Sequence, residues 1–124
     1  MIDESYNANP ASMAAALALL GVAKGRRIAV LADMLEMGEA STQHHAALSK
    51  TIEDAHADLV FVCGPQMQAL WDKLPASRRG GYAANSADLA KSLLAALKPG
   101  DTVLVKGSNG MKLSVVIDAL RARA

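Results

Sequence analysis

Three short apolar runs, each closed by a loop signal, limit most strongly what this chain can fold into. They occupy residues 27–32, 58–63 and 102–106, and they are nearly continuous in apolarity rather than alternating. That pattern is typical of strands buried on both faces of a parallel sheet. Asp33, Gly64-Pro65 and the segment 107–110 follow the three runs and end them. Weaker runs at 81–84 and 1–4 predict two further strands.

Helical patterns separate these runs. Asn9 is a candidate cap and Pro10 suits the first helical position, where no backbone donor is needed. The apolar stripe that follows repeats at the helical spacing in Met13, Ala16, Leu17 and Leu20. Further helices are expected after Ser41, over 66–72, after a cap at Ser86, and over 111–121. Strands alternating with helices predict one three-layer α/β/α, Rossmann-like domain over residues 1–124, with a mostly parallel sheet.

Composition narrows the class of protein further. Apolar residues make up 52% of the 124 residues, which is too many for a disordered chain. The formal net charge of +1 argues against a nucleic-acid or membrane-surface module, because such modules usually carry a basic field. No apolar run approaches the roughly 18 residues that a membrane span needs. We therefore expect a soluble cytoplasmic domain, and the start of the chain resembles that of a piece of a longer protein.

Candidate binding residues lie where ligands bind in open α/β sheets, beyond the carboxyl ends of the strands. Lys106 and the glycines of 107–110 precede a helix, so the segment can bind an anion or form only a tight turn. The segment 33–38 carries two carboxylates, which can bind an amine, and two apolar side chains, which can pack on the domain itself or on a partner. The opening segment 3–10 can hold a nucleotide or simply cap the first helix.

Other reactive residue types suggest no site. His44, His45 and His56 are expected at the surface, since their spacing does not let one metal ion reach them on a straight helix. Cys63, the single cysteine, is expected to act as a small buried hydrophobe. The phosphate-binding pattern Gly-x-x-x-x-Gly-Lys-Ser/Thr does not occur in the sequence.

Three segments together resemble one family. Residues 3–13 (DESYNANPASM), 28–38 (IAVLADMLEMG) and 103–112 (VLVKGSNGMK) are similar to the C-terminal domain of the Mur ligases and occur in the same order. The chain departs from the family at Ala32, commonly Gly, and at Asn109, often Arg. The methyl group of Ala32 is expected to narrow the approach of a neighbouring backbone, and Asn109 removes a charge-based substrate contact.

The resemblance implies an ATP-dependent, amide-forming ligase that adds D-alanyl-D-alanine to UDP-N-acetylmuramoyl-tripeptide in peptidoglycan synthesis. ATP and Mg²⁺ would be bound mainly by a central ATPase domain of the same chain, which this fragment lacks. The fragment would close over ATP, help bind the dipeptide and be inactive alone, with no catalytic residue or metal ligand of its own.

Site residues are also implied by the resemblance. The nucleotide side would comprise Asp3, Tyr6, Asn7 and Asn9, with Asp3 on the ribose. The dipeptide side would comprise Asp33, Met34, Leu35, Lys106, Ser108, Asn109 and Met111. The strand-end positions suggest that Asp33 faces the amine and that Ser108 or the 107–110 backbone binds the terminal carboxylate.

Two other classes of function fit the same residues. One is a stand-alone, non-catalytic nucleotide- or anion-binding module. The other is a structural interaction domain that docks a partner through Met34 and Leu35.

Overall fold

The computed structural model describes residues 2–4, 9–35, 37–108 and 111–123. Its strands are β1 Ile2–Glu4, β2 Arg27–Ala32, β3 Leu59–Cys63, β4 Arg79–Ala83 and β5 Thr102–Lys106. Its helices are α1 Pro10–Gly21, α2 Ser41–Asp54, α3 Gln68–Lys73, α4 Ser86–Ala96 and α5 Ser114–Arg123. Short 3-10 turns lie at Gly38–Ala40, Pro65–Met67 and Ala76–Arg78. Both weak apolar runs therefore belong to strands, as predicted.

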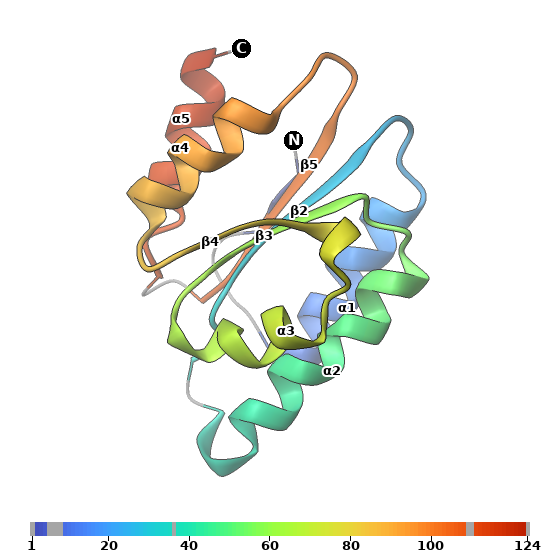
Figure 1. Ribbon diagram of the computed structural model, residues 1–124, viewed down its shortest axis with the longest axis vertical. Helices are drawn as coiled ribbons and strands as arrows, with labels where there is room; N and C mark the ends of the chain where they lie inside the picture. The colour runs from blue at the N-terminus through green and yellow to red at the C-terminus, as the bar shows by residue number, and fades with distance from the viewer. Residues whose placement is uncertain (1, 5–8, 36, 109–110, 124) are drawn as a thin grey trace.

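The strands form one five-stranded sheet in the order β1-β5-β2-β3-β4, and every neighbouring pair is parallel. Helices α1, α2 and α3 cover one face, and α4 and α5 cover the other (Figure 1). The predicted three-layer α/β/α fold is thus confirmed. β5 lies between β1 and β2, so the first and last of the described strands are neighbours and β1 forms one edge of the sheet.

Burial on both faces explains why the apolar runs are continuous. In β2, Ala29 and Leu31 pack into the cluster beneath α1, α2 and α3. Their neighbours Ile28 and Val30 point the other way, into the cluster beneath α4 and α5. Side chains on both faces of the strand therefore pack into a core. A polar residue inside the strand would be buried on either face.

Two helices begin with side-chain caps. The Asn9 side chain accepts the Ser12 N–H at 2.9 Å, and the Ser12 hydroxyl accepts the Asn9 N–H at 3.0 Å. The predicted cap of α1 is therefore confirmed. The prediction that Ser86 caps α4 is wrong, because Asn85 accepts the Asp88 N–H at 2.8 Å and Ser86 is the first helical residue. Asn85 has the extended backbone that a cap needs.

None of the helices in the described part of the chain is long and apolar enough to cross a lipid bilayer.

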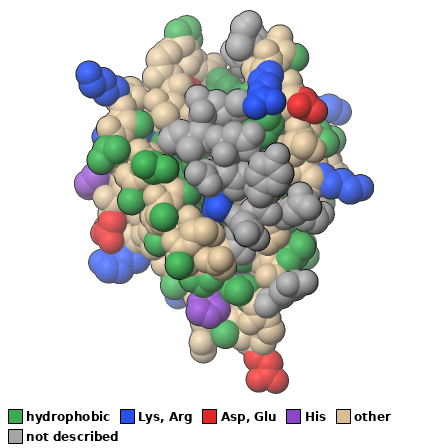
Figure 2. Space-filling view, turned by 180° about the vertical axis from the view of Figure 1, so that it is seen from behind, with side chains coloured by type: hydrophobic (Ala, Val, Ile, Leu, Met, Phe, Trp, Pro, Cys, Tyr) green, Lys and Arg blue, Asp and Glu red, His purple; other side chains and the backbone are tan. Residues whose placement is uncertain are grey.

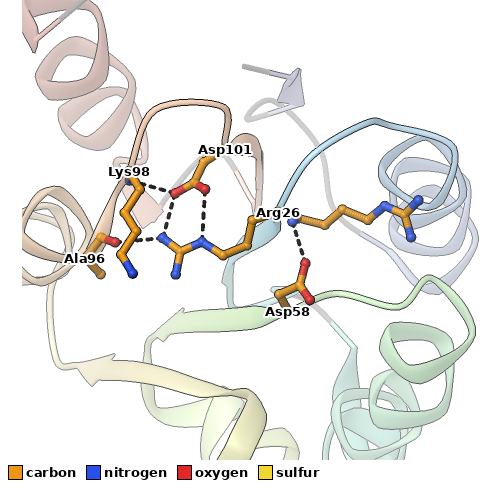
Figure 3. Close-up of polar contacts among 6 residues, drawn as sticks. Arg26, Asp58, Ala96, Lys98 and Asp101 are labelled. Atoms are coloured by element: carbon orange, nitrogen blue, oxygen red, sulfur yellow. Dashed lines mark hydrogen bonds and ion pairs between the residues drawn. The ribbon is translucent and has the colours of Figure 1, made fainter.

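A charged clamp joins the loops that precede β2 and β5, at the edge of the sheet where the strands begin. The Arg26 guanidinium donates to both carboxylate oxygens of Asp101, at 2.9 and 2.7 Å, and to the Ala96 carbonyl at 2.7 Å (Figure 3). The Lys98 N–H also donates to Asp101, at 2.8 Å. The guanidinium lowers the pKa of Asp101, and the Lys98 N–H acts in the same direction while burial opposes it.

We predict that Asp101 makes the stability of the domain pH-dependent at acid pH. Because its pKa is lower in the folded chain, the ionised form favours folding. This contribution is complete above the ordinary aspartate pKa of about 3.9 and is lost as the pH falls through the folded value. Asp101→Asn should lower the urea midpoint at neutral pH and flatten its acid dependence. An unchanged slope below about pH 4 in urea titrations would contradict the prediction.

Candidate functional site at the carboxyl edge of the sheet

The carboxyl ends of β1, β5 and β2 lie side by side. Glu4 pairs with Lys106 in the ladder of β1 and β5, and Leu31 pairs with Lys106 in the ladder of β2 and β5. The segments that follow these strands therefore leave the sheet at one edge, as the sequence predicts. Residues 5–8, 36 and 109–110, which include the candidates Tyr6, Asn7 and Asn109, lie outside the described residues.

Two hydrogen bonds join the loop after β2 to the loop after β5. The Ser108 N–H donates to the Asp33 carbonyl at 3.1 Å, and the Leu35 N–H donates to the Ser108 hydroxyl at 2.8 Å. These bonds continue the contact between β2 and β5 beyond the ends of the strands. Ser108 is thus held in place by its main chain and its side chain together.

The Asp33 side chain points inward, and only 1% of the residue is exposed. Its two carboxylate oxygens accept the N–H groups of Gln66, at 3.1 Å, and Met67, at 2.9 Å. Burial raises the pKa of Asp33, and these two N–H groups act in the opposite direction. The carboxylate therefore ties the loop after β2 to the turn after β3, and it presents almost no surface to a ligand.

Gly64 makes room for that carboxylate. A Cβ at this position would lie 2.5 Å from an Asp33 carboxylate oxygen, and the Gly64 φ of 107° is one that other residues rarely adopt. The hydroxyl of Tyr82 donates to the Gly64 carbonyl at 2.7 Å. The turn after β3 thus leaves space for the Asp33 carboxylate, because residue 64 has no side chain.

The other predicted dipeptide residues differ in what they expose. Met34 is 1% exposed and packs in the core beneath α1, α2 and α3, whereas Leu35 is 38% exposed. Lys106 is buried, and Ser108 and Met111 are partly exposed. The structure therefore brings Asp33, Met34, Leu35, Lys106 and Ser108 to one edge, but of these only Leu35 and Ser108 present appreciable surface.

Small residues let the two loops approach. A Cβ on Gly107 would lie 2.7 Å from the Ala32 Cβ and 2.7 Å from the Leu113 Cδ1. The absence of a side chain at Gly107 therefore accommodates the Ala32 methyl group. We expect the pair Ala32 and Gly107 to set the spacing of the loops.

The nucleotide candidates start from β1 and the cap of α1. Asp3 lies in β1, where its backbone pairs with Val105. The Asn9 side-chain oxygen is already engaged by the Ser12 N–H, so Asn9 has a structural task as well. β1, which carries Asp3, lies directly beside β5.

The histidine prediction is wrong for His45, which is fully buried, and it is right for His44 and His56, which are exposed. Sequence spacing did not reveal that His45 faces the loop after β2.

Within the described residues, no group of three or more His, Cys, Asp or Glu side chains is placed to hold a metal ion. Cys63 is buried as predicted, and burial raises the pKa of its thiol.

Two further residues of this edge were not predicted. Ser41 donates its hydroxyl hydrogen to the Gln66 side-chain oxygen at 2.6 Å, and the Gln66 N–H binds Asp33. The only sequence signal is the spacing of Ser41 and His45, which places both on one face of α2. Seen from behind, Lys and Arg side chains and Asp and Glu side chains are both scattered around the margin of the molecule (Figure 2), in keeping with the net charge of +1.

Comparisons with known proteins give this edge its context. Residues 1–109 match the family described as "Mur ligase, glutamate ligase domain". The chain is 35% identical over 123 residues to UDP-N-acetylmuramoyl-tripeptide–D-alanyl-D-alanine ligase of Escherichia coli and 34% identical over 122 residues to that of Buchnera aphidicola. The match to the Escherichia coli protein covers 98% of this chain, and the match to the Buchnera aphidicola protein covers 97%. The chain spans 26% of the length of each of these relatives.

Solved structures agree with the fold. The MurF ligase of Thermotoga maritima, determined in complex with ADP, superposes with a TM-score of 0.78 at 26% identity, covering 97% of this chain and 28% of that one. MurF of Acinetobacter baumannii superposes with a TM-score of 0.84 at 24% identity, covering 95% and 26%. The family match over residues 1–109, supported by the shared fold, shows that this chain belongs to the Mur ligase family, as its C-terminal domain.

Proposed function

We propose that this chain is the C-terminal domain of an ATP-dependent ligase that adds D-alanyl-D-alanine to UDP-N-acetylmuramoyl-tripeptide, a cytoplasmic step of peptidoglycan synthesis. The names of the relatives and the ADP in the Thermotoga maritima structure support the assignment. The observation that carries it is the similarity of nearly the whole chain to ligases of this name, at 34% and 35% identity. The loops after β2 and β5, which Ser108 joins, supply the edge at which we place the dipeptide.

The reaction has two steps. The tripeptide carboxylate attacks the γ-phosphorus of ATP, which gives an acyl phosphate and ADP. The amine of the dipeptide then attacks the acyl carbon, the amide forms, and phosphate and a proton leave. Positioning and charge neutralisation dominate such chemistry. Following the resemblance to the family, we assign Mg²⁺ and the phosphates of ATP to another domain of the full-length protein.

This chain would cover the reacting groups and shape the dipeptide side. Leu35 and Ser108 are our candidates for contact with the dipeptide, because both are at least partly exposed, and Asn109 and Met111 are the further candidates that follow Ser108 in the sequence. A cover that excludes water protects an acyl phosphate from hydrolysis. Asp33 would act by holding the loop, since its carboxylate is turned toward Gln66 and Met67 rather than toward an amine. On the nucleotide side, Asp3 is our candidate for the ribose, and Tyr6, Asn7 and Asn9, which follow it in the sequence, are our other candidates.

The test is the full-length protein that carries this chain. Phosphate release is measured with ATP, Mg²⁺ and UDP-N-acetylmuramoyl-tripeptide, with and without D-alanyl-D-alanine. We expect release, and formation of the amide product, only when the dipeptide is present. The fragment 1–124 alone should give no turnover.

Two results would contradict the proposal. One is a full-length protein that forms no amide with this dipeptide. The other is a fragment that binds ATP with micromolar affinity in calorimetry, which would instead favour a stand-alone nucleotide-binding module.

A further inference from the structure

His45 is a buried titratable side chain beside this edge, and the proposed reaction assigns it no task. It lies on the inner face of α2 and has no exposed surface. Its Nε2 lies 2.9 Å from the Met34 backbone nitrogen, and its Nδ1 lies 2.7 Å from the Ser41 carbonyl oxygen. Both ring nitrogens are therefore engaged by main-chain groups.

These two partners determine where the imidazole proton is. A backbone carbonyl can only accept, so Nδ1 carries the hydrogen and donates it to Ser41. A backbone N–H can only donate, so Nε2 is bare and accepts from Met34. An imidazolium would place a second hydrogen against the Met34 N–H. The fold thus selects one neutral tautomer.

Met34 is the middle one of three consecutive residues after β2, 33–35, that are held by three different segments. The Asp33 carboxylate accepts the N–H groups of Gln66 and Met67, in the turn after β3. The Met34 N–H donates to α2, and the Leu35 N–H donates to Ser108. Because Met34 is buried, its N–H has no access to bulk water and would lack a partner without His45.

We propose that His45 is a positioning residue for the dipeptide: its bare Nε2 fixes the Met34 main chain and thereby the placement of Leu35 against Ser108. This inference rests on the proposed function. It differs from a purely structural role in one measurable way. Removing the acceptor of the Met34 N–H should raise the KM for the dipeptide. The KM for ATP, whose candidate residues lie on and after β1, should stay the same.

The experiment compares His45→Gln with His45→Asn in the full-length ligase. A glutamine side chain reaches about as far as Nε2 and can accept the Met34 N–H. An asparagine side chain reaches about as far as Nδ1 and can only serve Ser41. We expect His45→Asn to raise the KM for D-alanyl-D-alanine about tenfold with the KM for ATP within about twofold, and His45→Gln to recover most of the loss. His44→Asn, on the exposed face of the same helix, is the matched control and should leave both constants unchanged.

Three results would overturn the inference. They are equal effects of the two variants, parallel increases in both KM values, and a lower melting temperature with both KM values unchanged. If His45→Asn does not fold, nitrogen-15 spectra of the wild-type protein decide, since a protonated Nε2 would exclude the arrangement. A wild-type ligase that forms no amide with the dipeptide refutes the proposed function. An active wild type whose His45 variants have unchanged KM values refutes only the role of His45.

Discussion

Asp33→Ala is expected to destabilise the domain by about 1–3 kcal/mol and, in the full-length ligase, to raise the KM for the dipeptide far more than that for ATP. The substitution leaves the N–H groups of Gln66 and Met67 without the acceptor that the carboxylate supplies. It also releases the loop after β2 from the turn after β3. The loop then keeps only its contacts to other segments, such as the bond from the Ser108 N–H to the carbonyl of residue 33. Urea unfolding of the 124-residue chain and steady-state kinetics of the ligase measure the two effects.

Asp33→Asn is the matched variant. It retains one acceptor oxygen of the same reach, so it should lose about half as much stability as Asp33→Ala. Because burial raises the pKa of Asp33, the ionised carboxylate is less favourable in the folded than in the unfolded chain. Its contribution to stability should therefore decline as the pH rises from the ordinary aspartate pKa toward the folded value, and Asp33→Asn should abolish that decline. Unchanged dipeptide kinetics in Asp33→Ala would remove Asp33 from the site.

Gly107→Ala should destabilise the domain by about 1–3 kcal/mol, because the added methyl group meets the Ala32 Cβ and the Leu113 side chain at 2.7 Å. The Leu113 contact involves the end of a flexible side chain and can relax. The Ala32 contact cannot relax without separating the loops after β2 and β5. The same substitution should therefore also raise the KM for the dipeptide.

Ala32→Gly in the same chain provides the control. Alone it should cost about 0.5–1 kcal/mol, since glycine weakens a strand. Combined with Gly107→Ala it should recover part of the loss, with a coupling energy of about 0.5 kcal/mol or more in a double-mutant cycle measured by urea unfolding. Strictly additive losses would show that the two residues do not set the spacing between the loops.

The amino-acid sequence determined the layers, the direction of the strands and the edge at which the candidate residues after β1, β2 and β5 leave the sheet. Those features follow from local patterns: apolar runs long enough for a strand, helical stripes, and a cap such as Asn9 that acts within four residues of itself. The meeting of the loops after β2 and β5 was also predictable, because parallel strands end at a common edge and ligands bind there.

Tertiary structure alone decided which way each side chain at that edge points. Asp33 looks from sequence like a carboxylate available to an amine, yet it faces Gln66 and Met67, which lie more than thirty positions further along the chain. His45 looks like a surface histidine, yet α2 turns it toward Met34. Both outcomes depend on contacts between segments distant in sequence, and periodicity reports only which face of an element is apolar, never which polar group fills a gap in that face.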